Sequence, residues 1–160
     1  MSKRIDTAAR LIRATPETIY AALTSAEALV QWMPPRGMTG EMQAFDPRPG
    51  GLQRMVLRYD DASIAGKSGS NEDIAEARFI DLVPNERVVQ TVDFVSDDPK
   101  FSGTMTMSTL LTSHGDHTEV RFTAENVPEG ISAEDHADGM NSSLENLAVY
   151  VERRPSEAPQ

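Results

Sequence analysis

Few residues of this 160-residue chain could carry chemistry, and the best placed are polar side chains set among apolar ones. Tyr59 and Gln53 stand at alternate positions of an apolar run, so both are predicted to face the interior of a sheet. Asp93 would face that interior only if the register of its strand shifted by one residue. The sequence offers no set of nucleophile, base and orienting group, which covalent catalysis requires. It therefore assigns no catalytic residue.

Two of the three histidines lie close enough in sequence to suggest a metal site. His114 and His117 flank Gly115-Asp116, and imidazole and carboxylate are groups that zinc accepts. A hairpin tip in solvent has no further groups to orient such ligands, so a polar turn is the prediction. His136 is predicted at the exposed start of a helix, with the mouth of a cavity as the alternative. The chain has no cysteine, and we predict neither a metal nor an organic cofactor.

The elements that must position these groups are clearest in segments 45–59 and 78–94. Each combines a Pro, Gly or Asn turn signal with a run in which apolar residues recur at every second position. This period of two predicts antiparallel strands with a drier and a wetter face. Gly50-Gly51 predicts a tight reversal, since it lacks the lysine and the following helix of a phosphate loop. In the strand over 51–59, the drier face holds Gln53, Met55, Leu57 and Tyr59. The wetter face holds Leu52, Arg54, Val56 and Arg58.

Helix signals stand near both ends of the chain. Thr15-Pro16-Glu17 supplies a capping hydroxyl, a proline suited to the first helical position and a carboxylate suited to the positive helix end. The apolar spacing that follows predicts two short helices, interrupted near Thr24-Ser25 and ended by Pro34-Pro35. A long amphipathic helix is predicted to begin at Ser132.

The order of elements predicts an α+β fold, with a curved antiparallel sheet gripping one long helix. A strand over 3–13 comes first, and we expect one domain over residues 1–152 and a flexible tail over 153–160. The polar loop over 60–71 is read as a lid over the gap between sheet and helix, or as a plain flexible hairpin. Six further strands are predicted over 39–46, 51–59, 73–82, 86–95, 101–113 and 117–125.

Motifs along nearly the whole chain carry a family resemblance. They are TPETIYAAL at 15–23, WMPP at 32–35, FDPRPGG at 45–51 with Arg54-Met55, RFIDLVPNERVV at 78–89, TMTMSTLL at 104–111, and the closing helix. Their order and spacing resemble the START-like (SRPBCC) superfamily, which has the helix-grip fold. The chain is most similar to the heat-shock-protein-90 ATPase activator homologue family and its single-domain bacterial members. The resemblance implies a cavity between sheet and long helix that can hold apolar molecules. Relatives in the superfamily include lipid carriers, hormone receptors, aromatase/cyclases of polyketide pathways and oxygenase domains.

A cavity of this kind would be lined by inward-facing apolar residues. Methionine is flexible and polarisable, and eight methionines suit a pocket that adapts to varied guests, although the same side chains would also fill an ordinary core. The predicted ligand-binding residues are Trp32, Met33, Met42, Gln53, Met55, Leu57, Tyr59, Phe79, Val92, Phe94, Met105, Met107, Phe122, Met140, Leu144 and Leu147.

We therefore predict binding of a small hydrophobic or amphipathic molecule between the sheet and the C-terminal helix. Two other functions stay open: an enzyme resembling polyketide cyclase/dehydratases or hydrolases, and a protein-interaction module of the chaperone ATPase-activator kind. The net charge of −10 argues against nucleic-acid and anionic-membrane partners. No secretory signal or membrane-spanning run is apparent, which favours the cytoplasm. The protein partner stays unidentified, and we expect a monomer or a weak homodimer.

Overall fold

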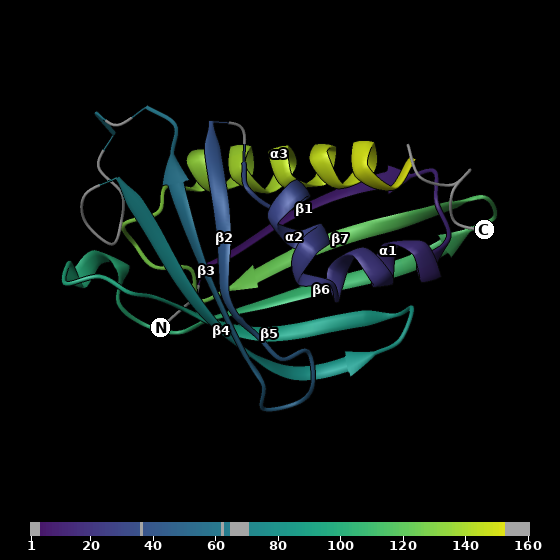
Figure 1. Ribbon diagram of the computed structural model, residues 1–160, viewed down its shortest axis with the longest axis horizontal. Coiled ribbons are helices and arrows are strands. Elements are labelled where there is room, and N and C mark those ends of the chain that lie inside the picture. The colour runs from purple at the N-terminus through teal and green to yellow at the C-terminus, as the bar shows by residue number, and fades with distance from the viewer. Residues whose placement is uncertain (1–3, 36, 62, 65–70, 153–160) are drawn as a thin grey trace.

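A seven-stranded antiparallel sheet in the order β1-β7-β6-β5-β4-β3-β2 forms the frame of the molecule. The computed structural model describes residues 4–35, 37–61, 63–64 and 71–152. The sheet curves around α3, with α1 and α2 beside that helix (Figure 1). This is the predicted α+β helix-grip fold. The elements are β1 (Ile5–Ile12), α1 (Pro16–Leu23), α2 (Ala26–Trp32), β2 (Met38–Phe45), β3 (Leu52–Tyr59), β4 (Glu72–Val83), β5 (Arg87–Phe94), the 3-10 helix η1 (Pro99–Phe101), β6 (Met105–His114), β7 (His117–Glu125) and α3 (Ala133–Glu152).

Each of the α-helices α1, α2 and α3 begins where a hydroxyl side chain caps it. The Oγ1 of Thr15 accepts a hydrogen bond from the Thr18 amide at 3.2 Å, and Pro16 occupies the first turn of α1 as predicted. The Oγ of Ser25 caps α2 in the same way, at 3.2 Å, which confirms the predicted interruption. The Oγ of Ser132 accepts from a first-turn amide of α3 at 3.0 Å. These caps act within a few residues, so the sequence predicts them well.

The alternation of β3 is confirmed, with one exception on its wetter face. Gln53 and Met55 are buried on the face toward the helices, and Arg54 and Arg58 lie on the other. Val56 shares the arginine face, yet only 1% of it is exposed. It stands between the two arginines, which form ion pairs with carboxylates of β2 and β4, and the alkyl stems of such charged chains can cover an apolar neighbour.

The Gly50-Gly51 pair forms the predicted tight reversal before β3. Gly50 has φ +86°, a conformation that favours glycine. A Cβ on Gly51 would lie 1.9 Å from the carbonyl oxygen of Asp46, so no larger residue fits there. The pair also exchanges backbone hydrogen bonds with Phe79 of β4, at 2.7 and 3.0 Å. The two glycines thus anchor the β2–β3 loop to the sheet.

The segment before β6 differs from its prediction. A strand was expected from residue 101, but β6 begins at Met105 and Phe101 ends η1. The cause is Asp98-Pro99, where the Oδ1 of Asp98 accepts from the Lys100 amide at 2.9 Å and starts a short helical turn. Phe101 then packs onto a small second cluster at this end of the sheet.

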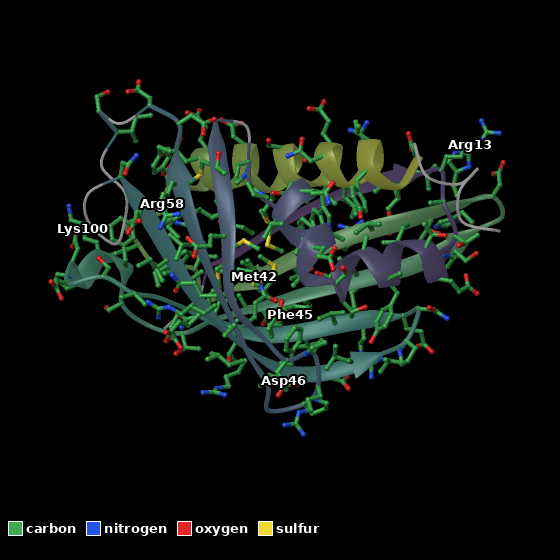
Figure 2. The ribbon with its side chains drawn as sticks, viewed as in Figure 1. Arg13, Met42, Phe45, Asp46, Arg58 and Lys100 are labelled. Carbon is green, nitrogen blue, oxygen red and sulfur yellow. The ribbon has the colours of Figure 1, made fainter. Side chains whose placement is uncertain are left out.

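The main core lies under the C-terminal half of α3, at what we call the packed end. Ile12, Ile19, Leu147 and Val151 are at most 1% exposed there. Figure 2 places Arg13 at this end and Lys100 at the opposite one. The Arg13 amide donates to the Oε2 of Glu152 at 3.0 Å, which ties β1 to the end of α3. No described helix is long and apolar enough to cross a membrane.

Two predicted segments fall partly or wholly outside the described residues. They are the tail over 153–160 and, within the loop over 60–71, positions 62 and 65–70.

Candidate ligand-binding cavity

A cavity of about 1430 Å³ lies between the N-terminal half of α3 and strands β3 to β6. Typical small-molecule sites measure roughly 300–1,000 Å³, so there is room for a sizeable guest. The cause lies in the sequence of α3. Its first two turns carry Asp135, His136, Asp138 and Gly139, and its first large buried apolar residue is Met140. The first two turns therefore place no large apolar side chain over the sheet.

The apolar residues beneath this half of α3 show the consequence. Leu57, Val92, Phe94 and Met107 line the cavity and are only half-buried, although they lie on the inward face of the sheet. Large apolar side chains on the inward face of a filled core are usually buried almost completely. We call this half of the molecule the hollow end. Its wall offers apolar surface against which an apolar ligand could pack.

Most of the predicted ligand-binding residues line this cavity. They come from α2, from strands β3, β5, β6 and β7, and from α3, so the inward face of nearly every element contributes. The lining includes Trp32, Met33, Gln53, Met55, Leu57, Tyr59, Val92, Phe94, Met105, Met107, Phe122, Met140 and Leu144.

Three of the predicted residues, Met42, Phe79 and Leu147, are not among the lining residues. Phe79 is 1% exposed, and its ring meets Phe45 edge-on at a centroid distance of 5.8 Å. Leu147 is fully buried at the packed end, and Met42 packs against the same core. Strand parity predicted the correct face for Met42 and Phe79, and helical spacing did so for Leu147, but neither pattern says how far along the sheet the filled region extends.

Tyr59 faces the cavity, as its parity predicts, and has a carboxylate partner that the sequence analysis did not single out. Its hydroxyl donates to the Oδ2 of Asp73 at 3.2 Å. Burial first, and then the nearby Asp73 carboxylate, raise the pKa of Tyr59 to about 12, with a further contribution from Asp135. Tyr59 therefore stays protonated at neutral pH and can act as a hydrogen-bond donor.

Asp73 itself is only 3% exposed and lines the cavity. A signal for it was present in the sequence. Phe79 was predicted to face inward, and counting back by twos along β4 gives Ala77, Ala75 and Asp73. Burying a carboxylate in a core costs free energy because the charge loses its water. A carboxylate at an inward strand position is therefore a candidate for function.

Gln53, the second predicted polar group, is buried beside another amide. Its Oε1 accepts from the Nε2 of Gln90 at 3.0 Å, and Thr109 is a further buried polar residue of the lining. Gln90 and Thr109 were not singled out because polar residues on inward strand positions look like ordinary alternation. Asp93 faces outward, where it accepts from the Thr104 hydroxyl at 2.7 Å, so its strand has no register shift of the kind considered.

His136 occupies the alternative position considered for it, and its predicted exposed position is wrong. Its side chain is 13% exposed, lines the cavity and has its Nδ1 2.8 Å from the Oδ2 of Asp6. Arg4 also donates to Asp6. Burial raises the pKa of the Asp6 carboxyl, but the hydrogen bonds from His136 and Arg4 outweigh burial and leave it below its ordinary value. The edge strand β1 runs beneath this helix turn, which the local sequence does not reveal.

The other two histidines meet at a hairpin tip. His114 pairs with His117 across the β6–β7 turn, and the Nδ1 of His117 lies 2.7 Å from the Oδ1 of Asp116. Within the described residues, no three His, Cys, Asp or Glu side chains are grouped to hold a metal ion.

Comparison with known proteins places this geometry in a family. Residues 13–152 match the sequence profile of the family described as Activator of Hsp90 ATPase homolog 1-like protein. The chain belongs to this family. A similar solved structure is a protein from Chromobacterium violaceum, with 29% identity, a TM-score of 0.83, and coverage of 92% of this chain and 96% of that chain. No curated protein matches the chain.

Two solved structures that are less than 25% identical show similarity in fold. A protein from Rhodobacter sphaeroides is 23% identical, with a TM-score of 0.75 and coverage of 95% of this chain and 93% of that chain. One from Rhizobium loti is 24% identical, with a TM-score of 0.71 and coverage of 92% and 96%. Together with the family match, these structures show the START-like helix-grip fold, which is compatible with ligand binding.

Proposed function

We propose that this chain, as one domain over residues 1–152 and in the cytoplasm, binds a small hydrophobic or amphipathic molecule in the cavity. The observation that carries the proposal is the set of half-buried apolar side chains around about 1430 Å³ of space. Burial of apolar ligand surface contributes roughly 25 cal/mol per Å², before the costs of association are subtracted. A ligand of moderate size can therefore bind through this surface alone, without a metal or a covalent bond.

The polar groups on the cavity wall would orient such a ligand. Tyr59 and Gln53 lie among apolar neighbours, and each already makes a hydrogen bond to another wall residue. Paired in this way they are held in position before the ligand arrives, which reduces the entropy lost on binding.

A fluorescence experiment tests the proposal. The neutral probe N-phenyl-1-naphthylamine should bind the purified protein and brighten. Met107→Trp adds bulk to the cavity wall and should weaken probe affinity by about tenfold or more, equivalent to roughly 1.4 kcal/mol. Leu110→Trp is the matched control, because Leu110 is on the outer face of the same strand and 37% exposed. An unmodified protein that takes up no probe, or equal weakening by both variants, would refute the cavity as the binding site.

The alternative enzymatic function, resembling polyketide cyclase/dehydratases or hydrolases, is favoured by one observation, the Tyr59–Asp73 hydrogen bond inside an apolar site. A protonated tyrosine can donate to a substrate carbonyl as negative charge develops on its oxygen. Tyr59→Phe should then abolish turnover of a polyketide-like substrate and leave its binding largely intact. Turnover that survives the substitution would remove Tyr59 from this role.

A further inference from the structure

A second polar feature of the cavity wall lies away from Tyr59. Gln53 of β3, Gln90 of β5 and Thr109 of β6 all line the cavity, and Gln53 and Thr109 are only 8% and 7% exposed. Gln53 and Tyr59 stand near opposite ends of β3, which at roughly 3.3 Å per residue puts them about 20 Å apart. We call Gln53, Gln90 and Thr109 the amide site.

The strand register brings the three residues of the amide site together. Gln53 pairs with Ala77 of β4, and this small side chain leaves room for the amides of Gln53 and Gln90 to meet across that strand. Gln90 and Thr109 are diagonal neighbours on the adjacent strands β5 and β6. A single ligand group can therefore reach all three.

The amide site has hydrogen-bonding capacity that the protein does not use. The Nε2 of Gln90 donates to the Oε1 of Gln53 at 3.0 Å, which leaves the NH2 group of Gln53 and the carbonyl of Gln90 over. Among the described residues, none bonds to these two groups or to the Thr109 hydroxyl. Every sealed side-chain nitrogen or oxygen in the described part of the chain has a partner, so these unpaired groups open onto the cavity.

The same capacity remains if both amides turn over. Gln53 then presents its carbonyl to the cavity and Gln90 its NH2 group. In either arrangement the site offers one strong donor group and one strong acceptor, with a hydroxyl beside them that can do both.

The strand positions paired with the amide site carry no charge. A charged ligand group placed there would lose its water without meeting a counter-charge on these neighbours, and a neutral polar group avoids that cost. The inward residues paired with the three members are Phe45, Ala77, Phe79, Met107, Val88 and Phe122.

We propose that the amide site binds the carboxamide end of an amphipathic ligand, whose apolar body lies along the rest of the cavity wall. The inference rests on the proposed binding function and specifies its ligand class. A carboxamide is neutral and carries an acceptor and a donor side by side, so its oxygen accepts from Gln53 while its N–H donates to Gln90. A ketone can only accept, and a carboxylate can only accept and is charged.

Three ligands that share one alkyl chain and one carbonyl group test the inference. Decanamide, 2-undecanone and decanoate differ only in the NH2, CH3 or O− group beside that carbonyl. Each is kept monomeric and competes with N-phenyl-1-naphthylamine for the protein at neutral pH. Apolar burial alone would favour the ketone, which is the least polar of the three. The amide site should reverse this order, with decanamide binding about fivefold or more tighter than 2-undecanone and decanoate binding weakest.

The outcomes separate this inference from the function on which it rests. Binding of 2-undecanone or decanoate as tightly as decanamide, or more tightly, would overturn the inference while the proposed function stands. If neither neutral ligand displaces the probe, or if the protein binds no probe, the proposed function itself fails.

A pair of double variants locates the preference at the amide site. Gln53→Met with Gln90→Met nearly keeps the side-chain length and removes both amides, so it should abolish the preference for decanamide over 2-undecanone. Gln31→Met with Gln43→Met removes two amides from exposed positions of α2 and β2, outside the cavity lining, and should leave the preference unchanged. Equal effects of the two double variants, or a preference that survives the loss of Gln53 and Gln90, would overturn the assignment.

Thr109→Val gives a second test if the Gln53 and Gln90 double variant does not fold. Valine keeps the branched shape of threonine and removes the hydroxyl, so the decanamide preference should fall about twofold or more while the affinity for 2-undecanone holds. An unchanged preference in this variant would count against the amide site.

Discussion

The two halves of α3 meet the same sheet in opposite ways. At the packed end, Leu147 and Val151 belong to one buried cluster with Ile12 and Ile19, and all four are at most 1% exposed. At the hollow end, the helix has polar residues and Gly139, and sheet residues such as Leu57 stay half-buried. One helix of 20 residues thus packs on the core with its C-terminal half and covers one side of the cavity with its N-terminal half.

This contrast separates the part of the fold with the most complete apolar burial from the part that contains the cavity. Helices α1 and α2 also contact α3, and buried residues of both belong to the main core. Apolar burial there pays the entropy cost of folding. At the hollow end the strand ladder and the small second cluster join the elements, and part of the inward face remains unfilled.

The largest expected difference is between two leucine truncations. Leu147→Ala removes a fully buried side chain at the packed end and should lower the free energy of unfolding by about 2–5 kcal/mol. Leu57→Ala removes a half-buried side chain that already borders empty space, so its loss should be about 1 kcal/mol or less. Urea denaturation of both variants measures this, and equal losses would mean that the two ends are equally packed.

Adding volume should give the reverse contrast with a smaller size. Ala148→Leu forces extra carbons into a site that is 2% exposed and should destabilise the protein by about 1–3 kcal/mol. Ala75→Leu extends into the cavity from a half-buried position and should change stability by less than about 0.5 kcal/mol. It should also weaken probe binding. A large destabilisation by Ala75→Leu would show that the hollow end cannot accept a side chain.

The remaining effect, which is absent at neutral pH, is a pH dependence that belongs to the hollow end. Because the pKa of Tyr59 is raised from 10.0 to about 12 in the folded protein, the folded state holds this proton more tightly than the unfolded state. The stability from this group is present below the ordinary value and is lost as pH rises toward about 12.

Ultraviolet titration of tyrosinate, taken as the difference between the protein and its Tyr59→Phe variant, measures this pKa directly. Asp73→Asn removes the carboxylate contribution and should lower the midpoint, while burial keeps it above the ordinary value. A difference titration centred at the ordinary pKa value would contradict the half-buried position of Tyr59.

Local patterns predicted much of the fold. The capping residues Thr15 and Ser25 act on amides three residues away, and the alternation of β3 follows from strand geometry, so both could be predicted. His136 was placed wrongly because its partner, Asp6, is 130 residues distant in the chain. Asp73 was missed although its inward position could be counted back from Phe79, whereas the unfilled space beside it is visible only in the tertiary structure.

The sequence alone determined the order of elements, the inward face of most strands and the family, because these depend on short-range geometry and on motifs in a fixed order. Tertiary structure decided where the interior is filled and where it is hollow. That outcome depends on which turn of α3 lies over which strand, and on the pairing of β1 with β7 from opposite ends of the chain. Side-chain volumes from distant segments must be summed in three dimensions before a gap can be recognised.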